Sequence, residues 1–124
     1  MKKVLNVGQC GFDHGSITRF LQGHFDAQVS PAATADEALG LLRRDSFDLV
    51  LVNRQFDADG DEGLSFIQTL KADPQLVGVP VMLITNYPDY AKRAVALGAV
   101  PGFGKSELAS PGLVSRLNPY LRGD

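Results

Sequence analysis

The segment from Gly8 to Ser16, GQCGFDHGS, carries several side chains that could do chemistry. Glycine-rich loops between a strand and a helix can bind phosphates through backbone N–H groups, but this spacing fits neither common nucleotide-binding motif. Cys10 has no basic neighbour or second cysteine that would activate its thiol. Asp13 and His14 are adjacent and lack a nucleophile beside them. We therefore expect a flexible loop with an inert thiol and an exposed histidine.

A second polar segment, residues 57–62, contains four carboxylates within six residues. An EF-hand calcium loop needs a glycine at its sixth position and a carboxylate at its twelfth. Counted from Asp57, Gly60 is the fourth residue and Gln68 is the twelfth. We exclude an EF-hand and expect a solvated turn.

Apolar segments must position these loops. Residues 48–52, DLVLV, and 79–84, VPVMLI, are apolar without alternation, which is typical of strands buried on both faces of a parallel sheet. Residues 4–7 form a shorter strand. Residues 27–29 and 100–104 are weaker strand candidates, because polar, glycine or proline residues interrupt them as in edge strands. We expect five strands.

Helical patterns separate the strands, and each begins or ends at a recognisable residue. Ser16 precedes an apolar stripe as its N-cap, and Thr34 with Glu37 has the spacing of a capping box. A third helix ends before Pro74, because the residue ahead of a proline is disfavoured in the α region. The fourth helix begins near Pro88 and ends at Gly98, and the fifth helix begins near Pro111.

Strand and helix alternate five times, which predicts one α/β domain over residues 1–124. Its fold class is a flavodoxin-like three-layer α/β/α sandwich, a (βα)5 unit with a five-stranded parallel sheet. Chemistry in such sheets lies at the carboxyl ends of the strands. The periodicity alone leaves flavodoxin-like and receiver-like proteins open.

Composition narrows the classes of function. Twelve Lys plus Arg against fourteen Asp plus Glu give a formal charge of -2, so we expect no nucleic-acid binding by this domain alone. One cysteine cannot form an intrachain disulfide, and with two histidines it cannot complete a structural zinc site. The apolar start is too short for a signal peptide or a membrane span. We expect a cytoplasmic protein without membrane contact.

The order of the motifs carries a family resemblance. DLVLVN at 48–53, GL at 63–64, VPVMLIT at 79–85, GA at 98–99 and then Lys105 follow one known order. The chain resembles the receiver domain of bacterial two-component response regulators over nearly its whole length. The resemblance implies a phosphoryl-accepting aspartate at the end of the third strand and an acidic pair after the first strand that holds Mg²⁺. A Thr or Ser and a Lys complete the family's pocket.

All three family carboxylates are missing here. Asn53 stands at the acceptor position, and Gly8 and Gln9 stand at the positions of the acidic pair. A neutral amide is a poor nucleophile toward phosphorus, and Mg²⁺ prefers carboxylate oxygens. We therefore expect no phosphorylation of Asn53, no Mg²⁺ binding or other metal, no cofactor and no enzymatic activity.

Two residues that the resemblance assigns to the pocket are present in this chain, Thr85 and Lys105. In one interpretation, their hydroxyl and ammonium converge on a bound anion. In the interpretation we favour, Thr85 bonds locally and Lys105 pairs with a nearby aspartate. A surrogate acidic site, in which Asp57 or Asp59 folds back toward Lys105, is a further alternative.

The resemblance also indicates a candidate interaction surface around the fourth helix. Aromatic residues and arginine are enriched in protein interfaces. The family's switch aromatic is replaced by Gly102, and the proline that follows its lysine is Ser106, so no cis peptide bond is expected. The surface residues are Tyr87, Tyr90, Lys92 and Arg93, with Phe103 beside Gly102.

We interpret the chain as a pseudo-receiver that binds a signalling protein without phosphorylation. The alternative is a receiver-like domain gated by a small anion at Thr85 and Lys105. A third class is an enzyme of flavodoxin-like topology, in which bound flavin would colour the purified protein.

Overall fold

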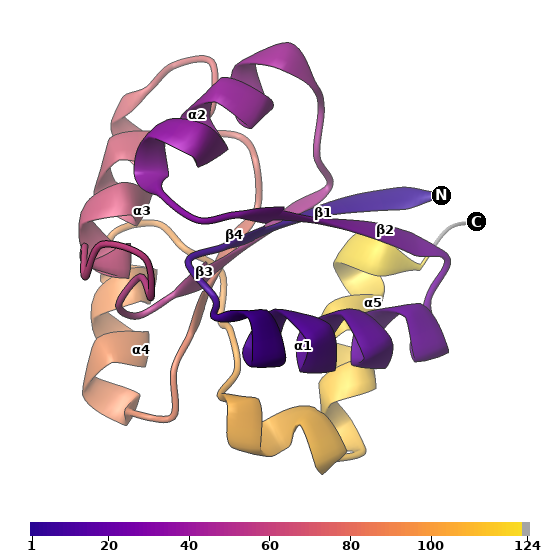
Figure 1. Cartoon of the computed structure of the whole chain (residues 1–124). Coiled ribbons are helices and arrows are strands. Elements are labelled where there is room, and N and C mark those ends of the chain that lie inside the picture. The colour runs from indigo at the N-terminus through magenta and orange to yellow at the C-terminus, as the bar shows by residue number, and fades with distance from the viewer. Residues whose placement is uncertain (123–124) are drawn as a thin grey trace.

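The computed structural model describes residues 1–122, which form a parallel sheet covered by helices on both faces (Figure 1). The strands are β1 (Lys2–Val7), β2 (Ala27–Ala32), β3 (Leu49–Asn53) and β4 (Val81–Ile84). They pair in the order β2-β1-β3-β4, and every pair is parallel. The helices are α1 (Gly11–His24), α2 (Ala35–Arg44), α3 (Gly63–Ala72), α4 (Pro88–Ala96), the 3₁₀ helix η1 (Lys105–Ala109) and α5 (Gly112–Leu121).

Alternate strand residues face two separate cores. In β3, Val50 and Val52 face a core with α2, α3 and α4, whereas Leu49 and Leu51 face a core with α1 and α5. Figure 1 shows the helices of these two cores as layers on opposite faces of the sheet. All four residues are fully buried, as continuous apolar strands predict. The three-layer α/β/α arrangement of the prediction is confirmed.

The prediction of a fifth strand is wrong, because residues 100–104 form only an isolated bridge with β4. The backbone N–H of Val100 donates to Val81 O at 2.9 Å, and the N–H of Thr85 donates to Phe103 O at 3.0 Å. Pro101 has no N–H to donate. The sheet therefore has four strands, and an extended segment lies along its β4 edge.

The start of α1 also differs from the prediction. The helix begins at Gly11, and Cys10 is its N-cap, with Sγ accepting a hydrogen bond from the N–H of Asp13 at 3.5 Å. Gly8 has φ 80°, a left-handed conformation that turns the chain sharply after β1. The expected flexible loop from Gly8 to Ser16 is therefore mostly helix, and Ser16 lies inside that helix.

The other predicted helix ends agree with the structure. Thr34 Oγ1 accepts a hydrogen bond from the N–H of Glu37 at 3.2 Å and caps α2. Helix α3 ends just before Asp73, and α4 begins at Pro88. Gly98 follows α4 with φ 111°. Among residues 1–122, no helix is both long and apolar enough to cross a membrane.

Candidate functional site

The carboxyl ends of β3 and β4 border an open pocket of about 250 Å³. Three residues predicted for the site, Asn53, Thr85 and Lys105, line it together, as the rule for parallel sheets predicts. Gly8 and Gln9 are not among its lining residues. The other lining residues are Arg54, Gln55, Ile84, Asn86 and Tyr87.

Asn53 uses its amide group to hold the surrounding backbone. Its Nδ2 donates to Gln55 O at 2.8 Å and to Gly8 O at 3.3 Å, so it links the end of β3 to the residue after β1. An ionised carboxylate accepts hydrogen bonds and cannot donate them. The amide at this position therefore has a structural role that an aspartate cannot reproduce.

Gly8, which the resemblance assigns to the first position of an acidic pair, is closed off by an aromatic ring. A Cβ atom added to Gly8 would lie 2.2 Å from Cδ1 of Phe56, and the φ of 80° would strain any residue with a side chain. Phe56 itself is 1% exposed. The neighbouring Gln9 has a buried amide whose Nε2 and Oε1 make no hydrogen bond within the described chain. Sequence reasoning missed Phe56, because a phenylalanine in a polar loop gives no sign of where its ring packs.

Lys105 has a carboxylate partner, and that partner is Asp13. Nζ donates to Asp13 Oδ2 at 2.7 Å, and both side chains are about 30% exposed. The hydrogen bond from Lys105 is the main cause that lowers the pKa of Asp13 below its ordinary value. Within residues 1–122, no ion pair joins Lys105 to Asp57 or Asp59, so the surrogate site does not form. Asp57 borders a separate pocket with Cys10, Asp13 and Asn53.

Thr85 bonds locally. Its Oγ1 accepts a hydrogen bond from the N–H of Tyr87 at 3.1 Å, at the start of α4. Next to it, Asn86 Oδ1 accepts from the N–H and the hydroxyl of Ser106, at 3.2 and 2.9 Å. These bonds join the loop after β4 to η1. Thr85 and Lys105 therefore have the local partners of the interpretation that we favour.

The positions that the resemblance assigns to metal ligands do not fit Mg²⁺. Gly8 has no side chain, Asn53 directs its amide nitrogen to two carbonyls, and the carboxylate of Asp13 is bound to Lys105. Mg²⁺ is normally held through one or two carboxylates with near-octahedral geometry. Within residues 1–122, no group of three or more His, Cys, Asp or Glu side chains is placed to hold a metal ion.

His14 is half-buried and not exposed as expected. Its Nδ1 lies 3.0 Å from Nδ2 of Asn6, a residue of β1 that is 1% exposed. Its Nε2 lies 3.5 Å from Thr18 Oγ1. His14 therefore takes part in the packing of α1 against the sheet.

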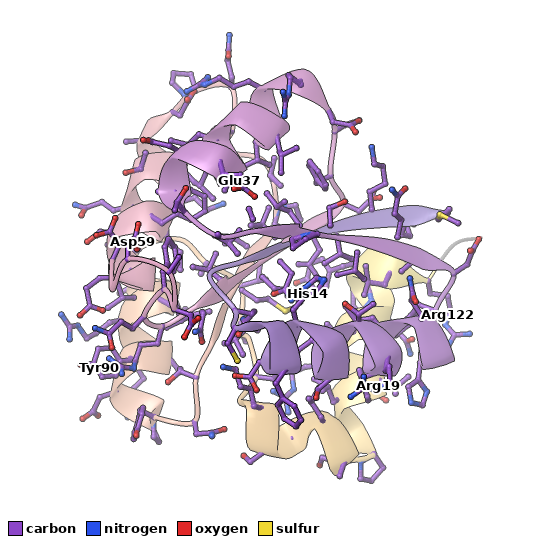
Figure 2. All side chains as sticks on the ribbon, viewed as in Figure 1. His14, Arg19, Glu37, Asp59, Tyr90 and Arg122 are labelled. Carbon is purple, nitrogen blue, oxygen red and sulfur yellow. The ribbon has the colours of Figure 1, made fainter. Side chains whose placement is uncertain are left out.

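The predicted interaction surface is exposed in part. Tyr87 is 60% exposed, and Lys92 and Arg93 are exposed on α4. Tyr90 is half-buried and points outward beside the loop of residues 54–62 (Figure 2). Phe103 does not belong to this surface, contrary to expectation, because it is 3% exposed and packs in the core with α1 and α5.

Two further details were not foreseen near that surface. Arg54 lies over the rings of Tyr90 and Tyr87, with its Cζ 4.9 and 5.7 Å from their centroids. Gly102 is packed against β4, since an added Cβ would lie 2.3 Å from Leu83 O. The position of the family's switch aromatic therefore has no room for a side chain.

The chain is similar to solved structures of response regulators and their signal receiver domains. The signal receiver domain of a DNA-binding response regulator from Colwellia psychrerythraea 34H matches with a TM-score of 0.79 and 25% identity over 96% of this chain and 97% of that one. The chemotaxis response regulator CheY4 of Vibrio cholerae matches with a TM-score of 0.74 and 22% identity, covering 94% and 98% of the two chains.

A third structure carries the modification that the family uses. A response regulator from Burkholderia pseudomallei with a phosphorylated aspartic acid, a calcium ion and citrate matches with a TM-score of 0.71 and 24% identity. The match covers 98% of this chain and 67% of that one. Neither a protein-family model nor a curated protein matches the sequence. The chain has the receiver-domain fold of response regulators.

Proposed function

We propose that this chain is a pseudo-receiver of a two-component-type signalling system, which binds a partner protein without being phosphorylated at the usual position. It has no catalytic activity of its own and works in the cytoplasm. Its fold is that of response-regulator receivers, and its pocket carries neutral residues where that chemistry needs carboxylates.

The observation that carries this proposal is the pair of hydrogen bonds donated by Asn53. Because its Nδ2 holds Gly8 O and Gln55 O, the acceptor position stabilises the loop in one arrangement without a phosphoryl group. The ion pair between Asp13 and Lys105 supports the same conclusion, since the ammonium that would neutralise a phosphoryl group already has a partner. A partner would then recognise a preformed surface.

Amide NMR on the ¹⁵N-labelled chain tests the absence of a phosphorylation switch. The spectrum is titrated with Mg²⁺ and then with beryllofluoride or acetyl phosphate, and a conventional receiver serves as the positive control. We expect the control to respond and this chain to show no shift at millimolar concentrations. Joint shifts of the amides of Asn53, Thr85 and Lys105 would contradict the proposal.

The pocket itself supports a second candidate, a domain gated by a small anion. Its volume of about 250 Å³ suits a small oxyanion, and Arg54 and Lys105 both border it. The candidate is weaker because Lys105 is already bound to Asp13.

Thermal unfolding with inorganic phosphate or sulfate separates the two candidates. A ligand that binds the native state raises its melting temperature. We expect no rise for the unmodified chain and a rise for Asp13→Asn, which frees the ammonium of Lys105. A rise for the unmodified chain that is lost in Lys105→Met would favour the anion-gated domain.

A further inference from the structure

A cluster of cations and aromatic rings lies on the surface between the β3–α3 loop and α4. We call it the Arg–Tyr cluster. Tyr90 is central, because Arg54 and Arg93 place their Cζ atoms 4.9 and 5.4 Å from its ring centroid. Tyr87 packs edge-on at 6.2 Å between centroids. The cluster comprises Arg54, Tyr87, Tyr90 and Arg93.

The charges of this cluster lack partners in the described chain. Within residues 1–122, neither Arg54 nor Arg93 takes part in an ion pair, and Asp89 in the first turn of α4 pairs with neither of them. A guanidinium held over an aromatic face leaves its N–H groups free for an oxyanion in the plane of the group. The aromatic rings thus hold the guanidinium groups in place, and the N–H groups of those arginines remain available to carboxylates.

Carboxylates of that kind lie on the same side of the molecule. The acidic loop, residues 57–62, contains four exposed carboxylates, and within residues 1–122 no ion pair involves them. Figure 2 shows Asp59 of this loop and Tyr90 of the cluster on the same side of the molecule, at the left of the view.

Backbone hydrogen bonds within the acidic loop hold it in one conformation before any partner binds. The N–H of Phe56 donates to Asp61 O at 2.8 Å, and the N–H of Gly60 donates to Phe56 O at 2.8 Å. Gln55 and Glu62 form an antiparallel bridge at the base of the loop. Binding therefore costs little loop ordering, which is the usual penalty for a flexible segment.

We propose that these two patches form a self-association surface, and that the occupant is a second copy of this chain. In a two-fold dimer the same surface contacts itself, so the acidic loop of each copy meets the Arg–Tyr cluster of the other. Because both patches face the same side, the two contacts form together. The dimer is weak and sensitive to salt, since exposed charge pairs are screened by ions. This inference does not depend on the pocket or on phosphorylation, so it fails or succeeds separately from the proposed function.

Sedimentation equilibrium of the full chain over a concentration series, at low and at high salt, tests the dimer. Two charge-reversal variants are compared with the unmodified chain: Arg54→Glu with Arg93→Glu, and Asp59→Lys with Glu62→Lys. Within each variant the cluster and the loop no longer carry opposite net charges, so we expect dimer affinity to fall at least tenfold. In an equimolar mixture of the two variants, the unaltered loop of one meets the unaltered cluster of the other and re-forms one of the two contacts. We therefore expect a heterodimer that is tighter than the dimer of either variant alone.

A matched control changes the same net charge elsewhere. Arg19→Glu with Arg122→Glu alters two arginines that lie on the other side of the view in Figure 2. We expect this variant to dimerise like the unmodified chain, and circular dichroism checks that all variants are folded. A dimer that tightens at high salt, or a control as weak as the cluster variant, would overturn the proposal.

Three other outcomes would also overturn the proposal. The first is an unmodified chain that stays monomeric at every concentration. The second is normal dimerisation of both charge-reversal variants, and the third is a mixture of the two variants that stays monomeric. If a glutamate-rich peptide shifts the amides of Arg54 and Tyr90 in a monomeric chain, the cluster takes an acidic segment of another protein and not a second copy.

Discussion

Nζ of Lys105 lies 2.7 Å from Oδ2 of Asp13, which joins two residues that are 92 positions apart in the sequence. Asp13 is in the first turn of α1, and Lys105 is the first residue of η1. The pair therefore ties the start of the first helix to the segment that follows the sheet. It also places a carboxylate beside the lysine that lines the pocket at the ends of β3 and β4.

Asp13→Asn is expected to cost about 1 kcal/mol of stability at neutral pH. The pKa of Asp13 in the folded chain is lowered by Lys105, so the carboxylate contributes fully above its unfolded pKa of about 4. The contribution is lost as the pH falls through the lower folded pKa. Urea unfolding across pH should show the variant and the unmodified chain converging at acid pH. A constant difference at every pH would contradict this account.

Asn53→Asp is expected to remain unphosphorylated and to lose about 1 to 2 kcal/mol of stability. A carboxylate cannot donate to Gly8 O and Gln55 O and places its negative charge beside them. Intact-mass spectrometry after incubation with Mg²⁺ and acetyl phosphate measures phosphorylation, and urea unfolding measures stability. Asn53→Ala is the control, since it removes the same donors without adding charge. Mg²⁺-dependent phosphate incorporation would refute the prediction.

Gly8→Ala is expected to cost about 2 to 4 kcal/mol, from backbone strain and from the clash with Phe56. Gly60→Ala is a matched control, because Gly60 has φ 76° and its nearest atom is 3.9 Å away, so only the strain of about 1 kcal/mol remains. In a Phe56→Ala background, Gly8→Ala should cost no more than Gly60→Ala does in the unmodified chain. Additive costs in this double-mutant cycle would show that the ring is not the obstacle.

Cys10→Ser is expected to raise stability by about 0.5 to 1 kcal/mol. Serine is among the best N-cap residues, whereas the thiol of Cys10 accepts the N–H of Asp13 at 3.5 Å as a weak acceptor. Thermal unfolding under reducing conditions measures the difference. Cys10→Ala, which has no acceptor at all, should lower stability, so equal values for Ser and Ala would show that Cys10 does not act as a cap.

The sheet and the convergence of the pocket residues could be predicted from the sequence. Residues 48–52 and 79–84 need apolar surroundings on both faces, and that need alone identifies strands of a parallel sheet with helices on both sides. The positions of Asn53, Thr85 and Lys105 then follow, because parallel strands end at one edge of the sheet.

The remaining details depended on contacts that local patterns do not encode. The segment 100–104 is not a strand because Pro101 donates no hydrogen bond and because Arg116 Nη1 donates to Gly102 O at 2.7 Å. The early start of α1 depended on cysteine as an N-cap, which is an uncommon choice. The partner of Lys105 was obscured for the same reason, since Asp13 was assigned to a flexible loop.

The extended segment beside β4 also affects how the sheet behaves toward other chains. An uncovered edge strand can pair with an edge of another molecule and start aggregation. Here one edge is covered by residues 100–104, where Pro101 offers no donor and Gly102 O is occupied by Arg116. The opposite edge is β2, which contains Pro31. A proline at each margin limits intermolecular strand pairing, so this sheet is protected against growth into larger β-aggregates.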